Sequence, residues 1–288
     1  MSTHRHDPRR LVLSFIQAEQ LLAMRQEGKD RGRVSPDLGL SEVWVTLDEE
    51  GVDFGDQLRV TWEELERIRS QETGCFRVTP KGVEKIQVFS ELTNRVYTLM
   101  PTRGAPTMLI SGIPMHRIKE IEPHEDTLRK IRAISPIVGR VLDTATGLGY
   151  TAIEASRAAD EVVTIELDPA ALEIARENPW SRLLFEAPNI RQLIGDSCEI
   201  VRELETASFD RIIHDPPMMS LAGEMYSGEL YRELYRVLKP GGRLLHYIGD
   251  LESKSSGNIA RGVAKRLEAA GFRRVVRRPE AFSLVAYK

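Results

Sequence analysis

Short apolar strands alternate with helical stretches from Val141 to the end of the chain. This alternation is typical of a mainly parallel sheet covered by helices, an α/β fold. We expect seven strands, at residues 140–143, 161–166, 189–194, 211–214 and 243–248, near 274–277 and over 283–287. Asp168-Pro169 predicts a helix over 170–177, and residues 239–242 (Lys-Pro-Gly-Gly) predict a helix stop and a turn.

The first part of the chain has a different pattern and predicts a smaller α+β domain. A helix is expected over 11–24, strands flank an acidic turn at 48–51, and Thr61 begins a capping-box sequence. We place this domain at 1–122, with a possible role in substrate recognition, and the α/β domain at 123–288. A helix over 125–134 carries Leu128, Ile131 and Ile134 on one face and leads into the sheet.

Composition narrows the class of protein. The 288 residues have a formal net charge of −3 and are 41% hydrophobic, which is typical of a folded globular protein. No apolar run reaches the roughly 20 residues of a membrane helix, and the first ten residues are not followed by an apolar region that ends in a small-residue cleavage site. Two cysteines are too few for a disulfide framework or a thiolate metal cage. We expect a cytoplasmic enzyme with no membrane partner and no metal.

A small-residue loop follows the first expected strand of the α/β domain. Small residues let a backbone approach a ligand closely, and the start of the next helix favours a negative group. A tight strand-to-helix turn without a ligand is the alternative interpretation of this loop. The candidate residues are Asp143, Thr144, Ala145, Gly147 and Gly149.

Acidic residues end the next two strands. Glu166 stands where doubly wound folds bind ribose hydroxyls, and Asp168 is better placed as a helix cap. Asp196 follows the third strand and has the position to accept from an adenine amine, although it serves equally well as an N-cap. A solvated strand end is the alternative for Glu166.

The sequence His214-Asp215-Pro216-Pro217-Met218 follows the fourth strand. It places a carboxylate at the carboxyl edge of the sheet, where open α/β sheets hold their ligands. Two consecutive prolines fix the backbone there, which a mere connection does not require.

These four motifs together resemble the class I S-adenosylmethionine-dependent methyltransferases, over about 150 residues from Val141 onward. The resemblance implies a Rossmann-like fold with S-adenosyl-L-methionine as cofactor. By it, residues 143–149 line the methionine part of the cofactor, Glu166 holds the ribose and Asp196 binds the adenine. Ala145 departs from the family, which usually has a glycine there.

The Asp-Pro-Pro motif resembles that of enzymes that methylate planar amino or amide nitrogens. The resemblance makes Asp215, Pro216, Pro217 and His214 the candidate catalytic residues. An aromatic residue usually follows the prolines and stacks on the target ring, but here the residue is Met218. Tyr226 or Tyr150 is expected to supply that platform instead.

The wider stretch 214–226 resembles archaeal methyltransferases that modify N4 of a cytidine, once or twice, in small-subunit ribosomal RNA. The expected partner is therefore RNA, as rRNA or a small-subunit particle. His214 either orients Asp215 or simply ends a strand. His116 either faces the cleft or is a solvated loop histidine.

Basic residues gather in two segments, and each is either an RNA contact or a solvated face. One set lies near the N-terminus, at positions 5, 9, 10, 25, 29, 31 and 33, and the other at 261, 265, 266, 273, 274, 277 and 278.

Two other function classes remain open from the sequence alone. One is a protein-amide or small-amine methyltransferase, or an aminopropyltransferase that uses a decarboxylated cofactor. The other is a non-catalytic RNA-binding assembly factor, against which the intact Asp215-Pro216-Pro217 motif argues.

Overall fold

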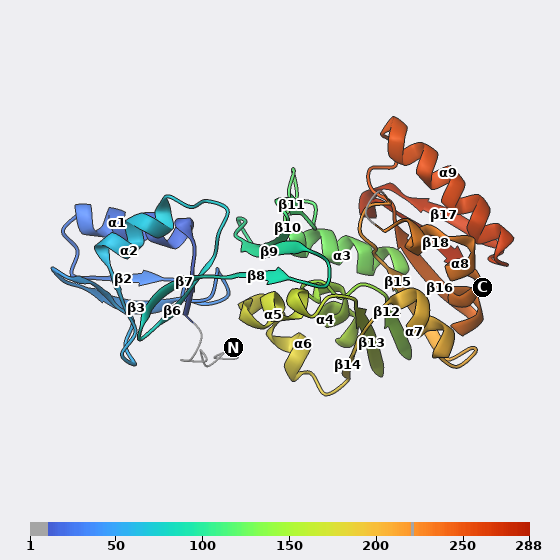
Figure 1. Ribbon diagram of the computed structural model, residues 1–288, viewed down its shortest axis with the longest axis horizontal. Helices are drawn as coiled ribbons and strands as arrows, with labels where there is room; N and C mark the ends of the chain where they lie inside the picture. Colours follow the sequence, from blue (N-terminus) through green and yellow to red (C-terminus); the bar gives the residue numbers. More distant parts are fainter. Residues whose placement is uncertain (1–10, 220–221) are drawn as a thin grey trace. The chain divides into compact units, whose positions relative to one another are not determined.

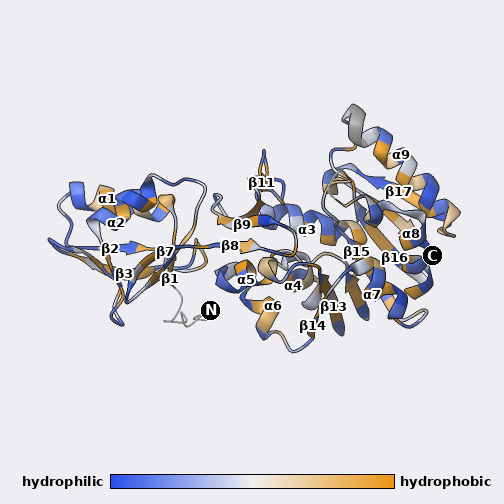
Figure 2. Ribbon diagram, viewed as in Figure 1, coloured by the Kyte–Doolittle hydropathy of each residue, from blue (hydrophilic) through white to orange (hydrophobic). Residues whose placement is uncertain are grey.

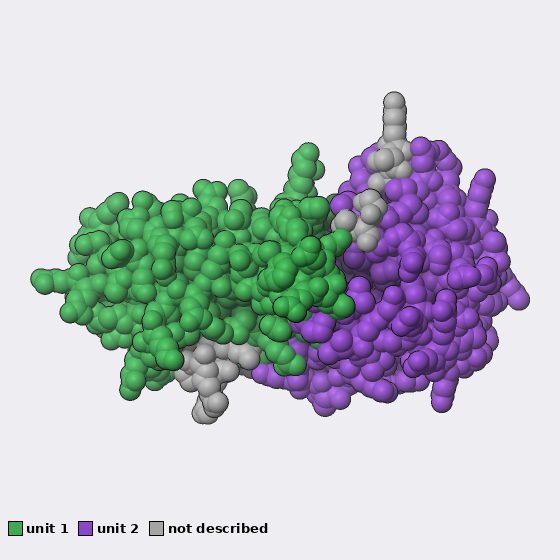
Figure 3. All heavy atoms as spheres, viewed as in Figure 1, with its two compact units in different colours: residues 1–124, 170–182 green, residues 125–169, 183–288 purple. Residues whose placement is uncertain are grey.

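The computed structural model describes residues 11–219 and 222–288, which form two compact units (Figures 1 and 3). One unit contains residues up to 124 together with 170–182, and the other contains 125–169 and 183–288. The segment 170–182 was expected in the α/β domain but packs with the first unit. Arg5, Arg9, Arg10, Ser220 and Leu221 lie outside the described residues.

The described residues of the first unit form three small antiparallel sheets, and one core packs side chains from the part between Leu11 and Val83. Its helices are α1 (Phe15–Gln26), α2 (Trp62–Arg69) and most of α5 (Pro169–Glu177), followed by the 3₁₀ turn η1 (Pro179–Ser181). Its strands are β1 (Leu11–Leu13), β2 (Arg31–Val34), β3 (Val43–Leu47), β4 (Gly51–Asp53), β5 (Arg59–Thr61), β6 (Phe76–Thr79), β7 (Gly82–Lys85), β8 (Gln87–Ser90), β9 (Arg95–Met100), β10 (Thr107–Ile110) and β11 (Ile113–Pro114). The capping box predicted at Thr61 is present at the start of α2.

The second unit is built on one large sheet. Its strands are β12 (Arg140–Asp143), β13 (Glu161–Glu166), β14 (Ile190–Ile194), β15 (Phe209–His214), β16 (Leu238–Tyr247), β17 (Arg274–Arg278) and β18 (Ser283–Tyr287). The helices that lie wholly or mostly in this unit are α3 (Pro123–Ile134), α4 (Tyr150–Ser156), α6 (Arg182–Glu186), α7 (Ser197–Glu203), α8 (Gly228–Val237) and α9 (Lys254–Ala269), with 3₁₀ turns η2 (Gly223–Tyr226) and η3 (Pro279–Ala281).

The strand order is β14-β13-β12-β15-β16-β18-β17, in which β18 alone runs antiparallel to its two neighbours. Helix α4 packs on β12, β13 and β14, while α8 contacts β16 and α9 contacts β17 and β18 (Figure 1). Figure 2 shows hydrophobic and hydrophilic residues alternating along α9, as expected of a helix that covers a sheet. The predicted Rossmann-like α/β fold is confirmed.

One local prediction was wrong. The helix expected from residue 11 begins at Phe15, because Leu11–Leu13 pairs with β6 and Ser14 caps the helix. The helix stop predicted at residues 239–242 is confirmed, because α8 ends at Val237. These four residues belong to β16, whose register with β15 shifts between Phe209 and Arg211.

Helix α3 buries polar side chains as well as apolar ones. On its apolar face Ile134 is buried, whereas Leu128 and Ile131 are half-buried. Asp126 and Lys130 are 0% and 4% exposed. Burying such groups is costly unless they pair with opposite charges.

The described residues contain no helix long and apolar enough to cross a membrane. Within the same residues, no group of three or more His, Cys, Asp and Glu side chains is arranged to hold a metal ion.

Candidate active site

The carboxyl edge of the large sheet brings the sequence motifs together. In the parallel register, Asp143 at the end of β12 lies beside Ile213, and Glu166 at the end of β13 lies beside Ile194. His214 at the end of β15 pairs with His246 of β16. Residues from four separate stretches of sequence thus share one edge, where parallel sheets hold their ligands.

The glycine loop between β12 and α4 needs its glycines at two positions. Gly147 and Gly149 have φ values of +53° and +78°, which favour residues without a side chain. A Cβ on Gly149 would also meet the Leu184 side chain at 2.7 Å. Ala145 does not have a positive φ. The alanine at the position of the usual glycine therefore fits the loop without backbone strain.

Glu166 holds this loop to the neighbouring strand. Its Oε2 accepts the N–H of Gly147 at 2.8 Å, and its Oε1 accepts the N–H of Asp168 at 3.0 Å. Burial raises the pKa of the Glu166 carboxyl, and the two backbone N–H groups oppose that rise. Each oxygen keeps a second lone pair, so the carboxylate can also accept from a pair of ligand hydroxyls.

Asp143 is fully buried beneath the loop. Its Oδ2 accepts the hydroxyls of Thr151 and Thr164, each at 3.1 Å. Burial raises the pKa of Asp143 to about 7, and the negative charge of Asp215 adds to the rise. A cation placed at the loop would therefore favour the ionised form of the Asp143 carboxyl.

Asp196 caps helix α7, accepting the N–H of Cys198 at 2.7 Å through Oδ1. The next residue, Ser197, donates its hydroxyl to the carbonyl of Thr144 at 2.6 Å. The expected cap is therefore present, and it joins α7 to the glycine loop. The cap engages one oxygen of Asp196, so an adenine contact through the other oxygen is compatible with it.

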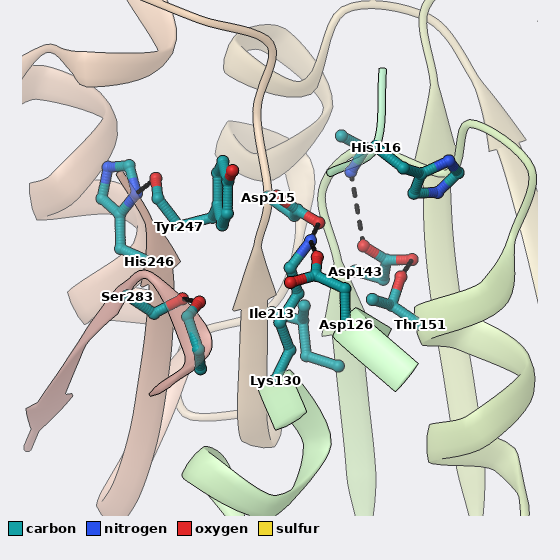
Figure 4. Close-up of polar contacts among 12 residues, drawn as sticks. His116, Asp126, Lys130, Asp143, Thr151, Ile213, Asp215, His246, Tyr247 and Ser283 are labelled. Carbon is teal, nitrogen blue, oxygen red and sulfur yellow. Dashed lines mark hydrogen bonds and ion pairs between the residues drawn. The ribbon is translucent and has the colours of Figure 1, made fainter. Parts of the chain in front are cut away.

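Asp215 follows β15 and is held by a lysine that the sequence analysis did not identify. Nζ of Lys130, on α3, lies 2.6 Å from Oδ2 of Asp215 (Figure 4). The Asp215 side chain is 18% exposed, and the part of the chain that the structure describes gives its Oδ1 no hydrogen-bond partner. Burial raises the pKa of Asp215, while the Lys130 ammonium acts to lower it.

Lys130 is itself enclosed by two carboxylates and an aromatic ring. Oδ2 of Asp126 lies 3.0 Å from its Nζ, and the ring of Tyr247 lies beneath the ammonium at 4.4 Å. Burial alone would lower the pKa of Lys130, but the charges of Asp215 and Asp126 raise it. Asp126 and Lys130 of α3 and Tyr247 of β16 thus join Asp215, directly after β15, in one charged cluster (Figure 4).

His214 uses both ring nitrogens away from Asp215. Nδ1 lies 2.7 Å from Oγ1 of Thr144, and Nε2 lies 2.8 Å from the carbonyl of Met225. Burial lowers the pKa of His214 to about 4, so the ring is neutral near pH 7 and Nε2–H donates to the carbonyl. His214 therefore joins the glycine loop to η2, and we describe it as a positioning residue.

The residues after Asp215 differ in how far they are exposed. Pro216 is buried, whereas Met218 is 55% exposed. Tyr226 is buried, and its hydroxyl donates to the carbonyl of Pro217 at 3.1 Å. Its ring packs near His246, with centroids 5.1 Å apart, so Tyr226 fixes the loop rather than offering an open face for stacking. The other suggested platform, Tyr150, is also buried.

His116 belongs to the other unit and lies in the segment between β11 and α3. It is half-buried, and its Nδ1 lies 3.0 Å from the hydroxyl of Thr107. Its part in substrate binding stays a prediction.

The residues at this edge fit S-adenosyl-L-methionine. The glycine loop supplies backbone without side chains, the buried Asp143 carboxyl suits a cationic group, and Glu166 has lone pairs left for two ribose hydroxyls. The fit concerns the hydrogen-bonding groups that the protein offers. Acidic residues stand at the ends of β12 and β13 and after β14, as the sequence motifs predicted.

Comparisons with known proteins identify a methyltransferase domain in this chain. Residues 141–242 match the family model described as a methyltransferase domain. A Streptomyces coelicolor protein named polyamine aminopropyltransferase 2 is 32% identical over 123 residues, 40% of this chain and 22% of that protein. A tRNA1(Val) (adenine(37)-N6)-methyltransferase from Citrobacter koseri is 37% identical over 95 residues, 30% of this chain and 36% of that protein.

Among solved structures, a spermidine synthase in complex with the transition-state analogue AdoDATO has a TM-score of 0.57 at 20% identity, covering 69% of this chain and 71% of that one. A Methanocaldococcus jannaschii protein named Uncharacterized protein MJ1233 is 45% identical over 231 residues, 80% of this chain and 78% of that protein. The chain therefore belongs to the family of this Methanocaldococcus protein and is an S-adenosylmethionine-dependent methyltransferase.

Proposed function

We propose that this enzyme methylates the exocyclic N4 of a cytidine in small-subunit ribosomal RNA, once or twice. The observation that carries the proposal is the state of Asp215 at the carboxyl edge of the sheet: Oδ2 is held by Lys130, while Oδ1 has no partner within the described chain. A carboxylate in this state suits an N–H donor better than a cationic substrate, because a cation already occupies its other oxygen.

The chemistry required is mainly positioning. The amino nitrogen of cytosine is a poor nucleophile, because its lone pair is delocalised into the ring. Hydrogen bonds from its two N–H groups to Asp215 and the Pro216 carbonyl would draw the nitrogen toward a tetrahedral shape. S-adenosyl-L-methionine, when bound, supplies an activated methyl group. Asp215 then accepts the proton that becomes acidic as the nitrogen takes up the methyl.

Surface charge supports an RNA substrate. Exposed basic residues line α9 and the edge strand β17 of the large sheet, and they are Arg261, Lys265, Arg273, Arg274 and Arg277. Such a patch can contact phosphates and makes binding dependent on salt. The similarity to a tRNA adenine-N6 methyltransferase also favours a conjugated amino group on a nucleobase. Target bases are expected where they can leave a stack.

Aminopropyl transfer is the second candidate, because the polyamine aminopropyltransferase and the spermidine synthase structure both resemble this chain. A polyamine is a polycation and needs acidic groups free to receive it. The buried ammonium of Lys130 lies between Asp126 and Asp215, the two carboxylates best placed for that role. This arrangement favours a neutral amino group over a polyamine.

A competition assay tests the assignment. The purified enzyme is incubated with methyl-labelled S-adenosylmethionine and small-subunit rRNA, with a protein extract, or with putrescine, and in parallel with the decarboxylated cofactor and putrescine. The proposal predicts label in RNA, recovered as N4-methylated cytidine after digestion. Label in protein, or an aminopropyl product from the decarboxylated cofactor, would overturn it.

A further inference from the structure

We propose that Lys130 and Asp126 are positioning residues that hold Asp215 ionised, with a single oxygen presented to the target amino group. The inference rests on the proposed function, since it takes Asp215 as the group that meets the nitrogen. It adds to that function two residues of α3 that stand 85 or more positions before Asp215 in the chain.

The geometry is that of a built site rather than a chance surface pair. Lys130 is 4% exposed and Asp126 is fully buried, and Nζ lies 3.0 Å from Oδ2 of Asp126 and 2.6 Å from Oδ2 of Asp215. The ring of Tyr247 lies 4.4 Å from the same ammonium. Two carboxylates and one ring face thus fix the position of Nζ, which in turn fixes the Oδ2 end of Asp215.

Partial burial explains why Asp215 needs a cation. A carboxyl removed from water tends to take up a proton unless a positive charge stands beside it. A protonated Asp215 would offer an O–H donor in place of an acceptor for the substrate N–H. The ammonium is therefore required for the acceptor role, and not only for the stability of the fold.

Several other groups act on this carboxyl from the surrounding elements. Asp126 on α3 raises the pKa of Asp215 through charge repulsion, and Asp215 in turn raises the pKa of Asp143 on β12. Burial raises the pKa of the Tyr226 hydroxyl, so this group stays neutral near pH 7. His214, which precedes Asp215, is neutral near pH 7 because burial lowers its pKa to about 4. The Lys130 ammonium thus opposes both burial and the Asp126 carboxylate, which raise the pKa of Asp215.

The test compares the same replacement, Lys→Met, at two buried or partly buried ion pairs. Lys130→Met removes the buried ammonium with little change in side-chain length. Lys239→Met is the matched control: its ammonium lies 2.7 Å from Oδ2 of Asp210, at the amino end of the same strand β15. Lys130→Met is expected to move the acidic limb of the kcat profile up by about one pH unit, so that kcat at a given pH on that limb falls up to about 10-fold. Lys239→Met is expected to leave both unchanged.

A replacement that keeps the positive charge separates the effect of the Lys130 charge from the effect of its shape. Lys130→Arg keeps the positive charge and is expected to keep the acidic limb near that of the wild type. Asp126→Asn removes the charge of one of the two carboxylates beside Lys130, so Lys130 is expected to be held less firmly. This variant is expected to change kcat more than KM. Affinity for S-adenosylhomocysteine, measured by calorimetry, is the check that each variant retains a folded cofactor site.

A measurement without substrate separates this inference from the proposed function. Carboxyl-carbon NMR of ¹³C-aspartate-labelled protein, with Asp215 assigned from Asp215→Asn, follows its titration directly. The titration of Asp215 is expected to move to higher pH in Lys130→Met and to stay in place in Lys239→Met. An unmoved titration overturns the role of Lys130, whatever the substrate. A shifted titration in an enzyme that leaves RNA unmethylated supports that role and overturns the proposed function alone.

Discussion

The imidazole Nδ1 of His214 lies 2.7 Å from the hydroxyl of Thr144, which joins the Asp-Pro-Pro motif to the glycine loop through one hydrogen bond. The other ring nitrogen contacts the Met225 carbonyl at 2.8 Å. A buried neutral histidine therefore links the glycine loop to the 3₁₀ turn η2 that follows the Asp-Pro-Pro motif.

This coupling predicts a pH dependence of stability. Burial lowers the pKa of His214 from 6.5 to about 4, so the unfolded chain binds a proton that the folded chain excludes between these values. The free energy of unfolding should therefore fall as pH falls through this window, by up to about 3 kcal/mol. His246, whose pKa is lowered by burial and by His214, acts in the same direction.

Denaturant unfolding at a series of pH values checks this prediction. His214→Gln should be less stable than wild type at pH 7, because it loses the two-sided contact, and should show a shallower loss of stability below pH 6.5. A variant with the same slope as the wild type would show that His214 does not carry the effect.

Replacing Asp215 separates catalysis from cofactor binding. Asp215→Asn should lower kcat by at least about 100-fold, because an amide cannot take up the proton released by the nitrogen. Its affinity for S-adenosylhomocysteine should stay within about threefold of the wild type. Asp210→Asn is the matched control at the amino end of β15, where Asp210 pairs with Lys239. Full activity in Asp215→Asn would remove the proposed mechanism.

Glu166 is predicted to act in cofactor affinity. Glu166→Ala loses the contact to Gly147 as well as the expected ribose contacts, so the cofactor dissociation constant should rise about 10- to 100-fold. Glu161→Ala is the control at the amino end of β13, where Glu161 pairs with Arg140 at 2.6 Å. Calorimetric titration gives both constants, and an unchanged affinity in Glu166→Ala refutes the ribose role.

Tyr226 is predicted to hold the Asp-Pro-Pro loop in place. Tyr226→Phe removes the hydrogen bond to the Pro217 carbonyl, which is worth about 1 kcal/mol, and kcat should fall about fivefold. Tyr231→Phe also loses a buried hydroxyl contact, to Nε2 of His246, but away from this loop. It should lower the melting temperature with little effect on kcat. Equal effects of the two variants on kcat would contradict a role specific to Tyr226.

The large sheet could be predicted from the sequence because its strands are local apolar runs. Glu161–Glu166 was predicted with the observed bounds, and Asp143, Glu166 and Asp215 stand at strand ends that a parallel sheet brings to one edge. Adjacent parallel strands share direction, so residues that end them must be neighbours. This part of the site needed no knowledge of side-chain packing.

The charged cluster could not be predicted in the same way. Lys130 meets Asp215 across 85 positions of sequence, a separation that no local pattern spans. The usable signal was the spacing of Asp126, Lys130 and Ile134, which puts all three on one helix face. A polar pair on the same face as a buried isoleucine indicates charges that are paired inside the protein.

Nucleoside mass spectrometry of total RNA from a deletion strain and its parent tests cytidine methylation in the cell. The deletion strain should lack one methylated nucleoside, an N4-methylated cytidine located in small-subunit rRNA. Re-expression of the wild-type enzyme should restore it, and Asp215→Asn should not. An unchanged nucleoside profile in the deletion strain would overturn the proposed function and direct the search to methylated proteins and small amines.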